Sequence, residues 1–224
     1  MKPDLSFTLP LAFEYVATVL WALTGSLVAA RRGYDIAGIV LIALVSATGG
    51  GLLRDGIFIN DGPPLVLESP TGVLLAAGVA IGVWLLGHRI DRIPHFQSSI
   101  MLLDAIGLGA FGLVGLQLSL AAGLSLPASV FVGVVNATGG EVLRDVLTRR
   151  EPTIFKPGTP SALAALAGCL VFLLLVFPLH MEGTAAGLLS VTVVFLIRVL
   201  SLRYDVRTRP ALGYDQDDDR WSPS

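Results

Sequence analysis

Hydrophobic residues along the chain fall in seven blocks of about 20 residues, separated by short stretches that hold most of the prolines and charged residues. A block of this length is what an α-helix needs to cross a hydrocarbon core of about 30 Å. The blocks lack the alternation of apolar and polar residues that is typical of membrane β-barrels. The pattern predicts an all-α bundle of seven transmembrane helices, at residues 11–30, 36–55, 71–87, 99–120, 127–146, 160–179 and 184–203.

Composition agrees with a multi-pass membrane protein. The chain is 54% hydrophobic and 14% charged, whereas soluble domains average about 45–50% and about 25%. A net charge of −2 gives no reason to expect a nucleic-acid partner. No P-loop, G-x-S-x-G or H-E-x-x-H motif is present, and Cys169 is the only cysteine. We therefore expect neither an enzyme nor a cofactor, and no resident metal ion.

Basic residues predict how the chain is oriented. Thirteen of the 15 Lys and Arg residues fall on one predicted face of the membrane. Setting aside Arg54, Arg144 and Arg198, which the pattern places within the membrane, leaves eleven against one. The positive-inside rule then predicts an outside N-terminus and a cytoplasmic C-terminus. Arginines on the cytoplasmic side could also bind an anionic lipid headgroup.

A repeat at an offset of 90 residues is the most informative pattern in the chain. "SATGGGLLRD" at 46–55 recurs as "NATGGEVLRD" at 136–145, with seven of ten positions identical. The same offset relates Glu14 to Asp104, Gly25 to Gly115 and Gly33 to Gly123. A unit of three helices is odd, so its second copy enters the membrane from the opposite side and forms an inverted repeat.

The repeat also predicts the domain organisation. Because the first block has a counterpart in the second copy, we expect it to be a helix of the fold and not a cleaved signal peptide. We expect an N-terminal extracytoplasmic segment at 1–10, a first three-helix repeat at 11–92, an inverted second repeat at 93–180, a seventh helix at 181–203 and a cytoplasmic tail at 204–224.

Paired glycines in the repeated motif have two interpretations. Adjacent glycines kink helices, and loosened carbonyls near the membrane midplane are where transporters and channels bind ions. Small residues also let two helices pack closely. Duplication at symmetric positions favours the first interpretation. The predicted ion pathway consists of Thr48, Gly49, Gly50, Gly51, Thr138, Gly139, Gly140 and Glu141.

Arg54–Asp55 and Arg144–Asp145 follow the glycines in both copies. They lie at the interface if the second helix stops near Leu53, and deeper if it runs to Ile59. Adjacent helical residues point about 100° apart, so each arginine is expected to pair with an acid on another helix rather than with its neighbour. Symmetry offers Arg54 with Asp145 and Arg144 with Asp55, or pairing to Glu14 and Asp104.

Three carboxylates bear on ion selectivity. Glu14 and Asp104 lie in the first turns of their helices, where they either interact with the helix N-terminus or attract cations at the two mouths of a pathway. Glu141 replaces Gly51 in the second copy, so the halves are not equivalent, and a carboxylate at this point favours cations over anions.

The doubled G-G-x-x-x-R-D motif and the "ARRGYD" turn, within residues 11–205, resemble the prokaryotic TRIC (trimeric intracellular cation) channel family, the bacterial glycine-transporter-like proteins with two repeats. The resemblance implies seven helices as an inverted 3+3 repeat plus one, a homotrimer, and a pore in each subunit lined by helices 1, 2, 4 and 5. It also implies kinks at Gly49–Gly51 and Gly139–Gly140 and passage of K⁺ and Na⁺. Glu141 departs from a triple glycine in the second half.

Three functional hypotheses follow. A passive channel for monovalent cations fits the paired glycines, the threonines and the acids. A secondary transporter of a small zwitterion such as glycine fits if Arg54 and Arg144 hold a carboxylate. A membrane scaffold fits the small-residue packing faces, but it gives no reason for a doubled Arg-Asp pair.

Overall fold

The computed structural model describes residues 11–60, 62, 64, 67, 69–90, 96–155 and 161–204. The side chains at 11–14, 87–90, 96–100 and 153 lie outside the described set, and Glu14 is among them. The predicted segment at 1–10 and the tail beyond Tyr204 also lie outside the described residues.

Within the described residues the chain forms seven α-helices, one π-helical turn and one short 3₁₀-helix, and no strand. Each α-helix coincides with one predicted block, which confirms the all-α fold class. The elements are α1 (Leu11–Arg31), α2 (Ile36–Leu53), η1 (Arg54–Ile59), α4 (Pro70–Ile90), α5 (Phe96–Ala121), α6 (Leu126–Leu147), η2 (Thr153–Phe155), α7 (Ser161–Val176) and α8 (Gly183–Arg203).

Four of the described helical segments are long and apolar enough to cross a membrane by length and composition. They are Ile36–Ile59, Met101–Ala121, Leu126–Leu147 and Gly183–Arg203. Shorter apolar helices occupy Tyr15–Arg31, Pro70–Leu86 and Ser161–Val176. Because η1 continues α2 without a break, the second span extends to Ile59, and Arg54 and Asp55 lie inside it rather than after it.

The first two helices of each half are joined by the same turn. Gly33 has φ +74° and Gly123 has φ +86°, a left-handed conformation that glycine adopts without a steric cost. In both turns the residue after the glycine donates its N–H to a carbonyl five residues earlier, at 3.2 Å from Tyr34 and 3.0 Å from Leu124. The sequence repeat is therefore also a repeat of backbone structure.

Helix packing is equivalent in the two halves. In the first half α1 packs on α2, and in the second half α5 packs on α6. An added Cβ on Gly25 would lie 2.6 Å from the Cβ of Ser46, and one on Gly115 would lie 2.6 Å from the Cβ of Asn136. These two contacts are related by the 90-residue offset, so one small residue in each half permits the same close helix approach.

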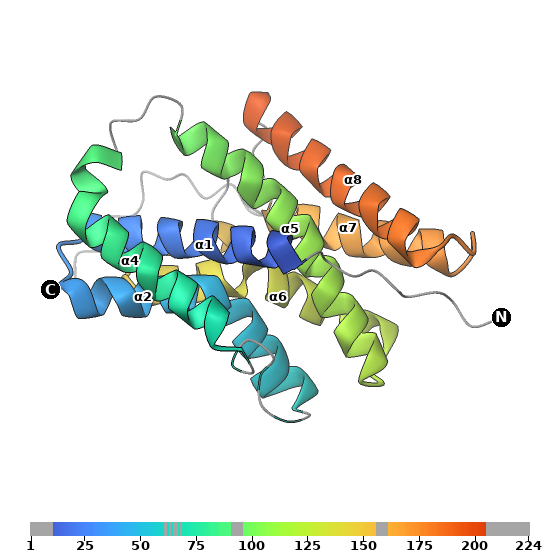
Figure 1. Cartoon of the computed structure of the whole chain (residues 1–224). Coiled ribbons are helices and arrows are strands. Elements are labelled where there is room, and N and C mark those ends of the chain that lie inside the picture. The colour runs from blue at the N-terminus through green and yellow to red at the C-terminus, as the bar shows by residue number, and fades with distance from the viewer. Residues whose placement is uncertain are drawn as a thin grey trace, which may run out of the picture.

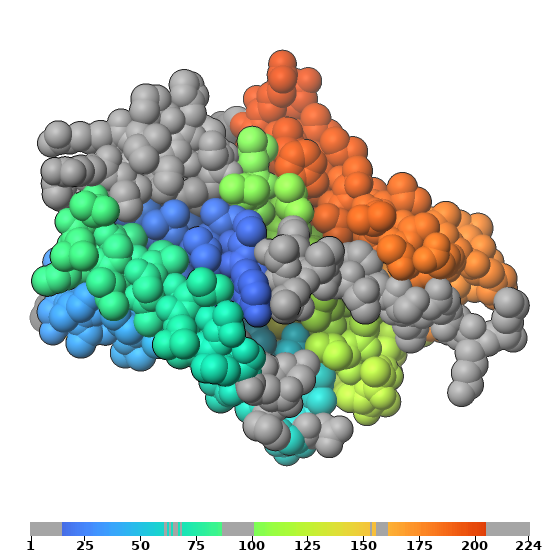
Figure 2. All heavy atoms as spheres, in the orientation of Figure 1, coloured from blue at the N-terminus to red at the C-terminus, as the bar shows by residue number. Residues whose placement is uncertain are grey.

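The two halves contact each other through two helix pairs, α2 against α6 and α1 against α5. Figure 1 shows α1 and α5 meeting near the centre with α6 behind them, and Figure 2 shows α4 and α8 on opposite sides of this central region. Trp21 on α1 and Phe111 on α5, which the offset also relates, lie with ring centroids 4.7 Å apart. Near an approximate two-fold axis, a residue contacts its own counterpart in the other half, and Trp21 and Phe111 are such a pair.

Helix α8 lies outside the repeat and packs on α5 and α7. Its Val194 is buried against two glycines, Gly109 of α5 and Gly168 of α7, where an added Cβ would collide with the valine side chain. The seventh helix is thus held closely against the second half.

Candidate functional site

Paired glycines form the crossing point of α2 and α6. An added Cβ on Gly49 would lie 3.1 Å from the Cα of Gly140, and one on Gly139 would lie 3.2 Å from the Cα of Gly50. A Cβ on Gly50 would collide with the carbonyl oxygen of Asn136, and one on Gly140 with that of Ser46. The two backbones touch here, so the glycines serve the close packing that was the alternative interpretation of the motif.

Helical hydrogen bonding continues through both glycine pairs. Helix α2 remains α-helical to Leu53, and α6 remains α-helical to Leu147. The departure from α-helical geometry comes later, in the π-helical η1, where the N–H of Asn60 donates to the carbonyl of Asp55 at 2.8 Å. A wide turn of this kind is common at functional sites. Ion passage beside the glycines stays a prediction.

The first Arg-Asp pair is buried in η1. The Nη2 of Arg54 donates to Oδ2 of Asp55 at 2.7 Å, and its Nε donates to Oδ1 of the same carboxylate. Arg54 is 5% exposed and Asp55 is 7% exposed, so both lie inside the protein rather than at a solvated interface. A buried pair tolerates this position because two parallel hydrogen bonds offset much of the desolvation cost.

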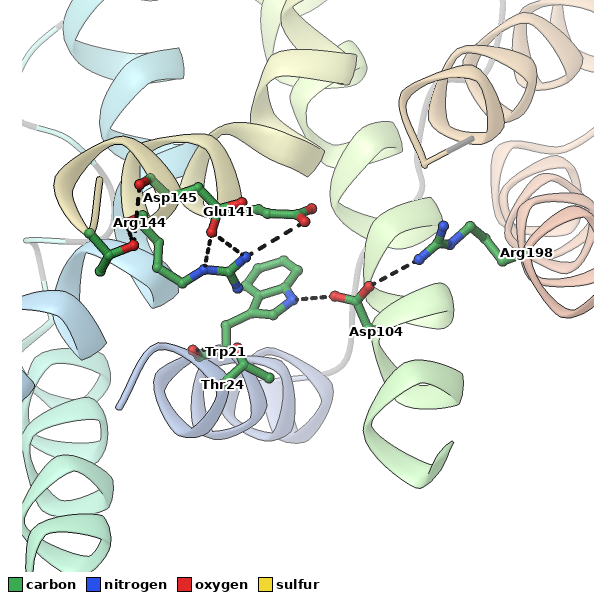
Figure 3. Close-up of polar contacts among 8 residues, drawn as sticks. Trp21, Thr24, Asp104, Glu141, Arg144, Asp145 and Arg198 are labelled. Carbon is green, nitrogen blue, oxygen red and sulfur yellow. Dashed lines mark hydrogen bonds and ion pairs between the residues drawn. The ribbon is translucent and has the colours of Figure 1, made fainter. Parts of the chain in front are cut away.

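The second Arg-Asp pair lies near the end of α6. The Nε of Arg144 donates to Oδ1 of Asp145 at 2.9 Å, and Nη2 of Arg144 lies 2.8 Å from the same oxygen. Glu141 adds a second carboxylate, with Oε1 at 3.6 Å from Nη2 of Arg144. Figure 3 shows the Arg144 guanidinium between these two acids. The second half therefore carries an acid that the first half lacks.

The prediction that each arginine would pair with an acid on another helix is wrong. Arg54 binds Asp55 and Arg144 binds Asp145, each the next residue in its own helix. The angle of about 100° describes the Cα–Cβ directions of adjacent residues. It does not limit a long arginine side chain, whose forked donors can fold back onto a neighbouring carboxylate.

Asn136 connects the two halves at this site. Its Nδ2 donates to the carbonyl of Phe111 on α5 at 2.7 Å, and its Oδ1 lies 3.4 Å from Nη1 of Arg54. The first half has Ser46 at this position, whose side chain is too short to make the equivalent bridge. The site therefore departs from two-fold symmetry at Asn136 as well as at Glu141.

Thr48 and Thr138, the two threonines of the predicted pathway, make equivalent hydrogen bonds within their helices. Thr48 donates its hydroxyl to the carbonyl of Leu44 at 2.8 Å, and Thr138 donates to that of Val134 at 2.9 Å. Both are buried beside the glycine crossing. Their equivalent bonds agree with the repeat, and each hydroxyl oxygen keeps an acceptor site.

Asp104 lies apart from the glycine crossing, in a junction of three helices. Its Oδ1 accepts a hydrogen bond from Nε1 of Trp21 on α1 at 3.1 Å, and its Oδ2 lies 3.7 Å from Nη2 of Arg198 on α8. Figure 3 shows the carboxylate between these two side chains. Neither Trp21 nor Arg198 was predicted as a site residue, because both lie outside the duplicated motif.

No group of three or more His, Cys, Asp or Glu side chains that could hold a metal ion occurs among the described residues. The charges of the site are instead arranged as ion pairs. With Asp55, Glu141 and Asp145 against Arg54 and Arg144, the described charges of η1 and α6 leave one carboxylate in excess.

Comparison with known proteins places these features in a family. A model of the glycine transporter family matches residues 11–88 and 101–176. The UPF0126 inner membrane protein YadS of Escherichia coli (strain K12) is 27% identical over 204 residues, covering 91% of this chain and 96% of YadS. The UPF0126 membrane protein YvgT of Bacillus subtilis (strain 168) is 30% identical over 162 residues, covering 70% of this chain and 76% of YvgT.

Solved structures show the same fold. The TRIC trimeric intracellular cation channel orthologue from Rhodobacter sphaeroides superposes with a TM-score of 0.75 and 30% identity, covering 87% of this chain and 97% of that one. A chain from a study of conductance through TRIC cation channels gives a TM-score of 0.80 with 24% identity, covering 89% and 95%. The chain is therefore a multi-pass membrane protein that belongs to the glycine transporter family and has the fold of the prokaryotic TRIC channels.

Proposed function

We propose that the protein is a passive channel for monovalent cations, K⁺ and Na⁺, with a pore through each subunit beside the glycine crossing of α2 and α6. The observation that carries the proposal is the likeness over 87% of the chain, at 30% identity, to a protein described as a cation channel. That likeness also covers 97% of the channel orthologue, so it is not limited to one part of either chain.

The charges at the site support cations over anions. Both arginines at the crossing form ion pairs with aspartates, which offsets their positive charge. Glu141 has a side chain that is 30% exposed, and it adds a carboxylate beyond these two pairs. A pathway bounded by an excess carboxylate and by hydroxyls such as those of Thr48 and Thr138 attracts cations and excludes anions.

The orientation proposed for the channel follows from the positive-inside rule, and the proposed trimer is supported by the likeness to a TRIC trimeric channel orthologue. We expect a homotrimer in the bacterial inner membrane, with the N-terminus outside and the C-terminus in the cytoplasm. Arginines on the cytoplasmic side are expected to contact anionic lipid headgroups. The activity requires no catalysis and no cofactor.

Transport of a small zwitterion is the second candidate, and the description of the matching family favours it. In this hypothesis Arg54 and Arg144 would hold the carboxylate of the glycine. In this structure Arg54 and Arg144 already hold Asp55 and Asp145, so a substrate carboxylate would have to displace a buried ion pair. The charge arrangement therefore supports the channel over the transporter.

Proteoliposomes separate these two functions. Purified protein should release trapped K⁺ at a rate that rises without saturation as the K⁺ gradient is increased, and labelled glycine should not exchange. Saturable counterflow of glycine without bulk K⁺ leak would instead establish the transporter. Empty liposomes and liposomes with heat-inactivated protein serve as controls for leak.

A further inference from the structure

Asp104 is shared by the two halves of the repeat and by the helix outside it. The residue belongs to α5, accepts a hydrogen bond from Trp21 of α1 and faces Arg198 of α8. No sequence offset predicts this junction, because α8 has no counterpart in the repeat. The carboxylate side chain is 36% exposed, so it can still interact with ions in water.

Arg198 is far more buried than the acid that it faces. The residue is 7% exposed, and its Nε and Nη1 atoms have no hydrogen-bond partner among the described residues. Its Nη2 lies 3.7 Å from Asp104, beyond the usual range of a hydrogen bond. This buried guanidinium depends on Asp104, its one counter-charge among the described residues, because desolvation of an unpaired charge is costly.

The position of Arg198 is set by the packing of α8. One turn earlier in the helix, Val194 is enclosed by Gly109 and Gly168. An added Cβ on Gly109 would lie 3.1 Å from the Cβ of Val194 and 3.2 Å from the Cα of Val191. The close packing of α8 thus places Arg198 beside Asp104, and Arg198 is not a freely moving surface side chain.

We propose that Arg198 is a positioning residue of the ion pathway, which holds the Asp104 carboxylate at the α1–α5–α8 junction and partly neutralises the attraction of that carboxylate for cations. The part of this inference that concerns the attraction of cations rests on the proposed channel function, whereas the part that concerns the ion pair does not. Through it the seventh helix, which lies outside the repeat, limits the cation flux of the repeat.

The two partners are not equivalent, and this asymmetry gives a test that needs no ion flux. Asp104→Asn removes the counter-charge that faces the buried Arg198, and the melting temperature of the protein in detergent should fall by about 5–10 °C. Arg198→Met leaves a half-exposed carboxylate that water and Trp21 still stabilise, so the fall should be about 2 °C or less. The double variant Asp104→Asn/Arg198→Met should regain most of the loss.

Conductance tests the electrostatic half of the proposal. Arg198→Met should raise the single-channel conductance about two-fold in about 20 mM KCl and change it little in about 1 M KCl, where surface charge is screened. Arg198→Lys should keep the wild-type conductance, and the double variant should lose the gain. Arg203→Met is the matched control, because Arg203 is an exposed arginine in the last turn of the same helix and is expected to give no such gain.

These experiments test the ion pair and its effect on cation flux separately. Equal losses of stability in the two single variants, with no recovery in the double variant, would overturn the ion-pair inference. A gain of conductance that persists in the double variant or in high salt would overturn its electrostatic half. Recovery of stability in a protein that passes no ions would leave the ion pair in place and contradict the channel function instead.

Discussion

Gly50 and Gly140 occupy equivalent places at the crossing of α2 and α6, and a Cβ on either would collide with the backbone carbonyl at the start of the other copy of the motif. Each glycine faces the carbonyl of the first residue in the other copy of the motif, Asn136 for Gly50 and Ser46 for Gly140. Because each copy of the motif packs on the other, the duplicated glycines are mutually required. The doubled motif is therefore a requirement of the interface between the halves as well as a candidate pathway.

Gly50→Ala should destabilise the fold, because the two backbones have no space for a methyl group. Forcing them apart is expected to cost about 1–3 kcal/mol or more, as overpacking does in well-packed cores. Thermal unfolding of detergent-solubilised protein measures the change. Gly140→Ala should behave in the same way, since it occupies the equivalent position.

Gly78→Ala is the matched control for this prediction. Gly78 is also within a helix, but nothing lies within 4 Å of a Cβ added there. The substitution should leave stability unchanged or raise it by up to about 1 kcal/mol through helix propensity. If Gly50→Ala were as stable as Gly78→Ala and lost only ion flux, the glycines would act in the pathway rather than in packing.

Asp55→Asn should be strongly destabilising. It leaves Arg54, which is 5% exposed, as a buried charge without its main counter-ion. Breaking one partner of a buried pair costs about 3–5 kcal/mol, whereas replacing both partners by apolar residues costs less. Melting temperatures of Asp55→Asn and of Arg54→Met/Asp55→Leu should therefore rank the double variant above the single one.

Asp35→Asn controls for the loss of a carboxylate in itself. Asp35 is exposed and caps α2 by accepting a hydrogen bond from the N–H of Gly38 at 2.8 Å. Asparagine caps a helix about as well as aspartate, so stability should hardly change. Equal losses in the two asparagine variants would contradict a special cost of burial at Asp55.

Asn136→Ala should weaken the contact between the halves. The substitution removes the amide that donates to the carbonyl of Phe111 and lies beside Arg54. Losing these buried contacts is expected to cost about 1–3 kcal/mol. Thr192→Ala, which removes an exposed hydroxyl bonded within α8, is the control and should cost much less. Similar melting temperatures for the two variants would refute a structural role for Asn136.

Glu141→Gln should reduce the preference for cations. The variant removes the carboxylate that exceeds the two Arg-Asp pairs, and its shape is nearly unchanged. We expect the ratio of K⁺ to Cl⁻ permeability to fall several-fold, because acidic groups lining a pathway set its charge selectivity. Glu182→Gln, at the exposed start of α8, should leave this ratio unchanged.

Much of the fold follows from the one-dimensional pattern of the chain. Seven apolar blocks correspond to seven helices, because a membrane-spanning helix has a fixed minimum length. The 90-residue offset correctly relates turns such as those at Gly33 and Gly123, because equivalent turns demand a residue that tolerates positive φ. These features depend on local chemistry, which the sequence carries directly.

Side-chain pairing is less predictable. The pattern indicated that Arg54 and Arg144 would be charged sites, but their partners depend on how far a flexible side chain folds back. Arg198 shows a second limit. Its partner Asp104 is 94 positions away on α5 of the second repeat, and the packing of Val194 against Gly109 and Gly168 brings α8 close to that repeat.

The reversal potential in asymmetric KCl tests the central claim most directly. Purified protein in a planar bilayer should carry ohmic currents that reverse close to the equilibrium potential of K⁺, because the excess carboxylate at the crossing of α2 and α6 favours cations. Replacement of K⁺ by Na⁺ should keep the current. A reversal at the equilibrium potential of Cl⁻, or silence from correctly folded protein, would contradict a cation channel.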